Sequence, residues 1–157
     1  MKLQFWTVGR NHEPYVKEGI EQFSKRISNY YPAEWNIIPS PKNAAMLSEM
    51  DLKKKEGETI CSFLQKDDYL VLLDERGKQF SSEELASFIQ QRANESVKSI
   101  VFLIGGAFGV SEEVRKRAHH TWSLSKLVFP HQLVRLILAE QVYRACSIIR
   151  NEKYHHQ

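Results

Sequence analysis

The chain has 157 residues, of which 42% are hydrophobic, 11% are aromatic and 26% are charged, and its formal net charge is +3. These proportions are typical of a folded, water-soluble protein, and the length predicts a single domain spanning residues 1–157. No apolar run approaches the roughly 20 residues that a membrane-spanning helix needs, so we expect no membrane contact. The small positive charge permits contact with nucleic acid but is too weak to predict it.

The N-terminal residues and the cysteines indicate a cytoplasmic protein without a bound metal. Residues 3–8 are typical of a β-strand and not of a signal peptide. Cys61 and Cys146 lie far apart and form no CxxC motif, which favours reduced thiols. Histidines occur as adjacent pairs at residues 119–120 and 155–156, with no HxxxH spacing, so we expect no metal site.

The first part of the chain alternates between predicted strands and helices. Residues 2–9 are rich in β-formers and predict a strand. Apolar residues at helical spacing predict a helix over residues 15–30, followed by a short strand at residues 34–38. Residues 43–65 predict a long polar helix. The dense charge run at residues 51–58 favours a solvated helix face, with contact to RNA phosphates as the alternative.

Two apolar runs, at residues 68–74 and 99–104, are typical of strands that are buried on both faces of a parallel sheet. The connecting segments predict a loop at residues 75–78, a helix that begins at Ser81 or Ser82 with Glu84 as its capping-box acid and ends near residue 94, and a short basic helix at residues 112–118. This alternation predicts an α/β fold with a mostly parallel sheet flanked by helices.

A glycine-rich turn follows the second apolar run. It contains Gly105, Gly106 and Gly109 and precedes the helix that Ser111 caps. Ligands of open α/β sheets bind at the carboxyl ends of strands, where glycines let the backbone approach them closely. Position 104 is isoleucine, so the dinucleotide-binding fingerprint is incomplete, and no P-loop pattern is present. The turn is a candidate ligand site, with a purely structural tight turn as the alternative.

The last predicted helix begins near Pro130 and runs to about Arg150, because proline suits the first turn of a helix. Phe129 is not an N-capping residue, and such a broken local rule often marks a functional site. The helix dipole disfavours a charged imidazole at His131. As a neutral ring, it could accept or donate one hydrogen bond. The alternative is a partly exposed histidine without a function.

Arg144 follows Glu140 by four residues in this helix. The simplest interpretation is an ion pair worth about 0.2–0.5 kcal/mol. The alternative is a guanidinium near a reaction centre, where it offsets charge on a base or holds an RNA phosphate. Apolar residues cover about half of the helix circumference, more than one buried face needs. Contact with both the sheet and a second subunit would explain this width.

Several segments together resemble one family. In chain order they are KLQFWTVGR, KEGETI, LLDERGKQFSSEELA, FLIGGAFGVS, SLSKLVFPHQLVRLILAEQVYRA and the closing YHH. They resemble the RlmH family of bacterial SPOUT-class methyltransferases, which methylate N3 of a pseudouridine in 23S rRNA of assembled ribosomes. The resemblance covers essentially the whole chain. It implies a trefoil knot near the C-terminus, which topology rules alone would not predict.

The resemblance also implies specific roles for residues of this chain. The methyl donor would be S-adenosyl-L-methionine, and the residues implied to bind it are Leu73, Gly105, Leu124, Ser125, Lys126, Leu127, Val128 and Phe129. Without the resemblance, Leu73 is interpreted as a core leucine. His131, Arg144 and Tyr154 are implied to position and activate the uracil-type ring. Members of the family are homodimers, and Tyr154 and His155 would complete the active site of the partner subunit.

Two other classes of protein remain as alternatives. A non-catalytic ribosome- or RNA-binding module would show salt-dependent RNA binding without a methylated product. Its basic surface would include Arg115, Lys116, Arg117 and Lys126, although scattered surface charge explains these residues equally well. A flavodoxin-like enzyme would bind a flavin or nucleotide and would be a monomer without a knot.

Overall fold

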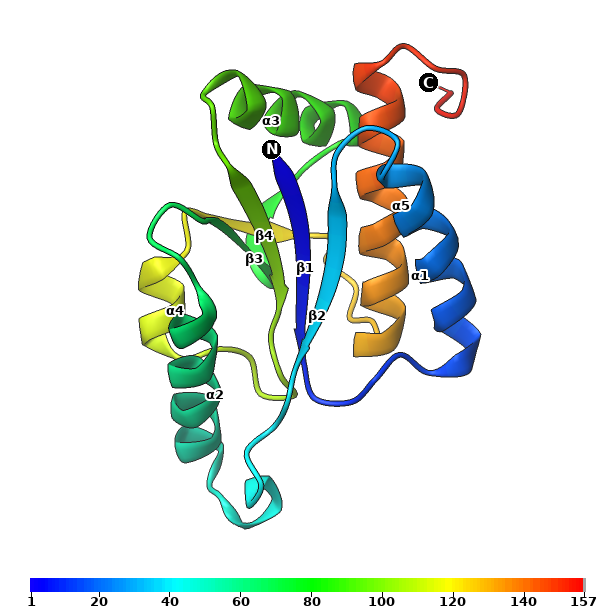
Figure 1. The fold of residues 1–157 in the computed structure, drawn as a ribbon. Coiled ribbons are helices and arrows are strands. Elements are labelled where there is room, and N and C mark those ends of the chain that lie inside the picture. Colours follow the sequence, from blue (N-terminus) through cyan, green and yellow to red (C-terminus); the bar gives the residue numbers. More distant parts are fainter. Residues whose placement is uncertain (157) are drawn as a thin grey trace.

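The computed structural model describes residues 1–156, and strands alternate with helices along most of it (Figure 1). In chain order the elements are β1 (Lys2–Val8), α1 (Pro14–Ile27), β2 (Ala33–Ile38), the 3-10 helix η1 (Ala44–Met46), α2 (Glu49–Phe63), β3 (Tyr69–Gln79), α3 (Ser82–Asn94), β4 (Ser99–Ile104), α4 (Glu112–Arg117), β5 (His120–Ser123) and α5 (His131–Ile149). None of the described helices is long and apolar enough to cross a membrane. The predicted α/β class is confirmed.

Within residues 1–156, five strands form one sheet in the order β2-β1-β4-β3-β5, and all its pairs are parallel. All six residues of β4 are buried, because this strand lies inside the sheet and helices cover both of its faces. The strands point in one direction, so the carboxyl ends of β3, β4 and β5 lie at the same edge. Ligands of open parallel sheets bind at such an edge.

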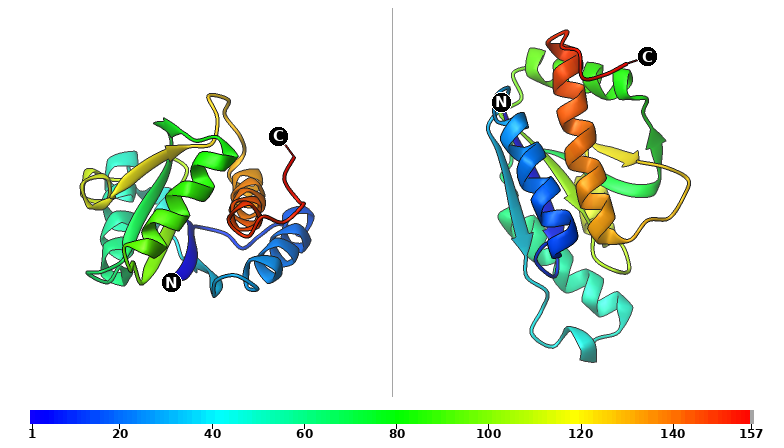
Figure 2. Two further views of the ribbon diagram at one scale, coloured as in Figure 1. Left: turned by 90° about the horizontal axis from the view of Figure 1, so that it is seen from above. Right: turned by 90° about the vertical axis from the view of Figure 1, so that its right-hand side faces the viewer.

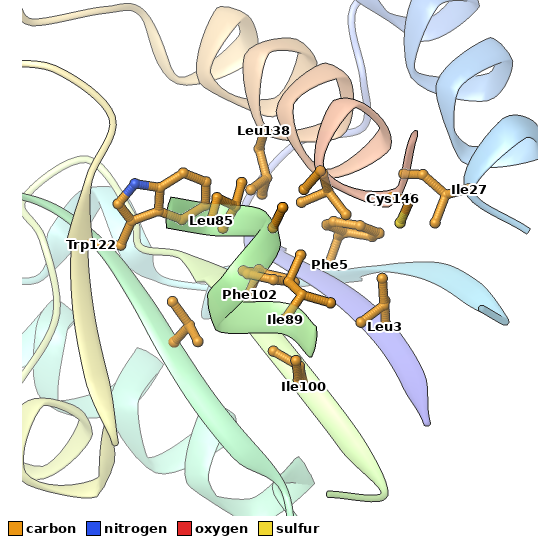
Figure 3. Close-up of a cluster of buried hydrophobic side chains, with 14 of the residues drawn as sticks. Leu3, Phe5, Ile27, Leu85, Ile89, Ile100, Phe102, Trp122, Leu138 and Cys146 are labelled. Atoms are coloured by element: carbon orange, nitrogen blue, oxygen red, sulfur yellow. The ribbon is translucent and has the colours of Figure 1, made fainter. Parts of the chain in front are cut away.

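Helices cover the sheet in two layers (Figures 1 and 2). α1, α3 and α5 pack on one face, where Phe102 of β4 and Leu138 of α5 belong to the same buried cluster (Figure 3). α2 and α4 cover the other face, where Leu103 packs in a cluster with Ile60 and Val114. Neighbouring residues of β4 thus face opposite layers, as the two-residue period of a strand requires.

The helix predicted for residues 43–65 is shorter than expected. η1 occupies part of its first turns, and Leu47 after it is extended, with ψ of 147°. α2 begins only after Ser48, whose hydroxyl oxygen accepts a hydrogen bond of 3.2 Å from the backbone N–H of Asp51. The prediction was wrong at its start because this serine is an N-cap and not an interior helical residue.

The prediction of a loop at residues 75–78 is wrong, because β3 continues through these residues with a bulge. Leu73 and Lys78 both pair with Trp122 of β5, so the residues between them are displaced from the ladder. Gly77 allows the two backbones to approach, since a Cβ at this position would lie 2.5 Å from a backbone oxygen of β5. The bulge therefore places polar side chains at the carboxyl edge of the sheet.

Candidate functional site

A cavity of about 910 Å³ opens at the carboxyl edge of the sheet. Four segments form most of its wall: the end and bulge of β3, the glycine turn after β4, the loop after β5 and the start of α5. The lining residues include residues 72–76, 104–112, 124–125 and 127–129, His131 and Val134 of α5, and Met50, Lys53 and Lys54 of α2. The cavity brings together segments that are far apart in the sequence.

The loop after β5 presents apolar side chains to the cavity. Two serines shape it: the hydroxyl of Ser123 donates to the carbonyl oxygen of Ser125 at 2.9 Å, and the hydroxyl oxygen of Ser125 accepts from the backbone N–H of Leu127 at 3.0 Å. Leu127 and Val128 consequently stay 70% and 81% exposed. Exposed apolar groups in a loop at the end of a strand suit a flat heterocycle such as adenine.

The glycine turn forms the wall below this loop. Gly109 has φ of +86°, in the left-handed region that favours glycine, and its N–H donates to the carbonyl oxygen of Gly106 at 3.1 Å. A Cβ on Gly105 would lie 2.7 Å from a methyl carbon of Val110. The turn is therefore closely packed, and its backbone faces the cavity without side chains at these positions.

Charged residues lie at the mouth of the cavity. The carboxylate of Asp74, in the bulge of β3, accepts a hydrogen bond of 2.6 Å from the guanidinium of Arg115 on α4. It also accepts one of 2.8 Å from the backbone N–H of Arg76. Burial on its own raises the pKa of Asp74, but these hydrogen bonds outweigh it and hold the pKa below its ordinary value. Asp74 is thus an ionised anchor for α4.

His131 is the first residue of α5 and lines the cavity. Desolvation and the nearby charge of Arg135 lower its pKa. Arg135 is buried one turn further along the helix, and its guanidinium donates to Nδ1 of His12 at 3.3 Å. The side chain of His131 is exposed at the cavity, and its lowered pKa favours an uncharged imidazole with a nitrogen that can accept a proton or a hydrogen bond.

Arg144 and Tyr154 belong to a second polar cluster, at the other end of α5. The Glu140 carboxylate accepts hydrogen bonds from Nε of Arg144 at 2.9 Å and from the hydroxyl of Tyr154 at 3.0 Å. The guanidinium carbon of Arg144 lies 4.7 Å from the centre of the Tyr154 ring. Thirteen residues of helix separate His131 from Arg144, which is about 20 Å at a rise of 1.5 Å per residue. One chain therefore does not bring these groups to the cavity.

The sequence of residues 1–155 matches the SPOUT_MTase family, described as predicted SPOUT methyltransferases. The chain belongs to this family. Ribosomal RNA large subunit methyltransferase H of Cytophaga hutchinsonii is 49% identical over 156 residues, which cover 99% of this chain and 100% of that protein. The protein of the same name from Parabacteroides distasonis is 44% identical over 157 residues, with both chains fully covered. The resemblance to the RlmH family is confirmed.

Two solved structures share the fold at low sequence identity. A probable methyltransferase from Bordetella pertussis Tohama I has a TM-score of 0.57 and 12% identity, covering 92% of this chain and 94% of that chain. A probable methylase family protein from Haemophilus influenzae Rd KW20 has a TM-score of 0.54 and 11% identity, covering 99% and 70%. At these identities the comparison supports the fold alone.

Most of the residues that the family resemblance assigns to the cofactor line the cavity. The predicted cofactor residues that line the cavity are Leu73, Gly105, Leu124, Ser125, Leu127, Val128 and Phe129. Lys126 belongs to the same loop, but its side chain is exposed and is not part of the wall. Leu73 also packs against the buried cluster, so it combines the core and cavity interpretations. Of the three predicted catalytic residues, only His131 lines the cavity.

Several residues at the site were missed from the sequence. Asp74 ends a predicted strand and Arg76 lies in a predicted loop, and no sequence pattern pairs Asp74 with Arg115. Arg135 could have been found, because it follows His131 by one helical turn. The charge run at residues 51–58 is mostly solvated as predicted, but Glu56 is only 7% exposed and is the exception.

Proposed function

We propose that this protein is an S-adenosyl-L-methionine-dependent methyltransferase that methylates N3 of a pseudouridine in 23S rRNA of assembled ribosomes. The observation that carries the proposal is the cavity, whose wall contains seven of the eight residues that the family resemblance assigns to the cofactor. Full-length relatives named ribosomal RNA large subunit methyltransferase H support the RNA substrate. A cytoplasmic location follows from that substrate.

The residues of the cavity fit this cofactor. Its volume of about 910 Å³ lies within the range of roughly 300–1,000 Å³ that is typical of small-molecule sites. Leu73, Leu124, Leu127 and Val128 provide apolar walls for an adenine ring. Gly105 lets the backbone approach the ligand without a side chain. When bound, the cofactor supplies an electrophilic methyl group on a sulfonium sulfur.

The protein contributes alignment and control of one proton. Transfer to N3 forms a nitrogen–carbon bond, breaks the carbon–sulfur bond and leaves its electron pair on sulfur, while the N3 proton must depart. His131 is uncharged at the cavity and can hydrogen-bond this proton or accept it. Holding the nucleophile in line with the methyl group lowers the barrier further, because the two groups then react within one complex.

Arg144 and Tyr154 act in the partner subunit of a homodimer in this proposal. Arg144 lies about 20 Å along α5 from His131 of the same chain, and Tyr154 packs against Arg144. Arg144 would offset negative charge on the deprotonated base, and Tyr154 would orient the ring.

A methyl-transfer assay tests the proposal. The protein is mixed with methyl-labelled S-adenosyl-L-methionine and ribosomes that lack the modification, and the label is mapped by nuclease digestion and mass spectrometry. Label on one pseudouridine of the large-subunit RNA is the expected result. Cofactor binding without label would reject the substrate. Salt-dependent RNA binding without cofactor binding would favour the non-catalytic RNA-binding module instead.

A further inference from the structure

Glu56 is a buried acid directly behind the glycine turn. It lies on α2 and is only 7% exposed. Its two carboxylate oxygens would lie 2.6 and 3.0 Å from a Cβ on Gly106, so the carboxylate occupies the space that this glycine leaves open. Gly106 lines the cavity, as does Lys53 one turn earlier on α2. The acid therefore stands immediately behind the cavity wall.

This acid has no counter-charge among residues 1–156. Burial is the sole cause that raises the pKa of Glu56, and neither a hydrogen bond nor a neighbouring charge among residues 1–156 offsets it. Burying a carboxylate without a partner is costly, so such groups are usually paired with a cation. A cation that enters the cavity would provide the missing partner.

We propose that Glu56 is a specificity-determining residue that makes the cavity favour the cationic cofactor S-adenosylmethionine over its uncharged-sulfur product, S-adenosylhomocysteine. The inference rests on the proposed function. The two compounds share the adenosine and amino-acid groups and differ by one methyl group and one positive charge on sulfur. A carboxylate behind a poorly solvated wall attracts the sulfonium more strongly than it would in water. Transfer of the methyl group removes this attraction and promotes product release.

The same arrangement couples cofactor binding to a proton. The sulfonium favours ionised Glu56, so at a pH where Glu56 is protonated in the free protein the binding of S-adenosylmethionine releases a proton, whereas binding of the product does not. Affinity for the cofactor then increases with pH as long as Glu56 is protonated in the free protein, and levels off once it is ionised there.

Other charged groups face the same region and need a control. They are Lys53 and Lys54 on α2, Asp74, Glu75 and Arg76 on β3, Glu112 and Arg115 on α4, and His131 across the cavity, while residues 105–110 of the turn carry no titratable side chain. A pH response that arises from any of these groups persists when Glu56 is replaced by glutamine. The response that Glu56 causes disappears in that variant.

Isothermal titration calorimetry of the full-length protein tests the inference. The ligands are S-adenosylmethionine, S-adenosylhomocysteine and sinefungin, which carries an amine near the sulfonium position. Glu56→Gln keeps the size of the side chain and removes its charge, and Glu58→Gln makes the same change at an exposed position of α2. Titrations in two buffers of different ionisation enthalpy measure the proton that is released.

We expect Glu56→Gln to weaken the binding of S-adenosylmethionine and sinefungin by roughly tenfold, within the range usual for coupled sites. The binding of S-adenosylhomocysteine should be nearly unchanged. In Glu56→Gln the proton release is lost together with the gain in affinity for S-adenosylmethionine. Glu58→Gln behaves like the wild type. Equal weakening of all three ligands, or no change, would overturn the inference while the proposed function stands. If wild-type protein binds neither S-adenosylmethionine nor S-adenosylhomocysteine, the proposed function fails as well.

Discussion

The carboxylate of Asp74 joins the bulge of β3 to α4, because it lies 2.6 Å from the guanidinium of Arg115. Both side chains are largely shielded from solvent, with exposed fractions of 11% and 25%. Their pairing fixes one side of the cavity mouth relative to the sheet. The pair thus connects a local irregularity of one strand with the shape of the proposed cofactor site.

Replacing Asp74 with alanine leaves Arg115 without its acid and should destabilise the protein by roughly 1.5–3 kcal/mol, the usual contribution of a hydrogen bond to a charged group. We also expect weaker binding of S-adenosylmethionine, because the mouth of the cavity loosens. Urea denaturation and calorimetry measure the two effects. A double-mutant cycle with Arg115→Ala provides the control, and additive effects of the two substitutions would contradict the pairing.

The pairing of Asp74 with Arg115 also predicts how the free energy of unfolding changes at acid pH. The folded-state pKa of Asp74 lies below its ordinary value of 3.8. Its contribution is therefore present above that value and is lost as the pH falls through the lower folded-state pKa. Unfolding free energies measured from neutral pH into the acid range should converge for wild type and Asp74→Asn at the acid end. Parallel profiles would show that Asp74 is not held ionised.

Gly77→Ala should destabilise the protein by about 1–3 kcal/mol, the usual cost of overpacking. The added Cβ would lie 2.5 Å from the carbonyl oxygen of Thr121, so β3 and β5 would have to separate at the bulge. Glu75→Ala in the same bulge is the matched control, because Glu75 is exposed. Thermal unfolding of both variants measures the difference, and equal melting temperatures would contradict the close backbone approach.

The strands were largely predictable from local sequence, whereas the site was not. Residues 69–73 and 99–104 are apolar on both faces and form β3 and β4 as expected. The continuation of β3 was missed because its polar residues and Gly77 are typical of a loop. Pairing with β5, from about 50 residues away, stabilises this extension, and such long-range contacts leave no periodic signal in the strand itself.

The positions of functional residues required the family resemblance or the structure. Nothing in local spacing predicts that Leu73 and Leu124 share one cavity. The dense charge run around Glu56 predicts a solvated helix face. Packing against the glycine turn determines its burial, and that contact depends on the tertiary structure and not on the helix alone.

Glu56→Gln should stabilise the free protein at neutral pH by about 1 kcal/mol, since an unsatisfied buried charged group costs roughly 1–3 kcal/mol or more. The folded-state pKa of Glu56 is raised above the ordinary value of 4.5. Stability from this group is therefore present below 4.5 and is lost as the pH rises through the folded-state pKa. Urea denaturation at several pH values should show that Glu56→Gln has the higher free energy of unfolding only near neutral pH and not at acid pH. A destabilised variant at neutral pH would mean that the carboxylate has a partner.

Cys146 should resist alkylation in the folded protein. It is buried in α5, and burial raises the pKa of its thiol to about 12, so almost no reactive thiolate is present at neutral pH. Cys61 is partly exposed and is the internal comparison. Mass spectrometry after brief iodoacetamide treatment should find modification of Cys61 first, and both cysteines should react after denaturation. Rapid modification of native Cys146 would contradict its burial.

The partner-subunit role of Arg144 can be tested by mixing two inactive chains. His131→Ala removes the group at the cavity, and Arg144→Ala removes the group at the far end of α5, so each homodimer should be inactive. A heterodimer of the two variants has one site with both residues intact if His131 of one chain works with Arg144 of the other. We expect such heterodimers, purified with two different tags, to recover about half of the wild-type methyl-transfer activity, because a twofold dimer has two equivalent sites. If both residues act within one chain, every site of the heterodimer lacks one of them and no activity returns. Activity in either homodimer would instead remove that residue from the catalytic assignment, provided that its melting temperature and cofactor affinity match those of the wild type.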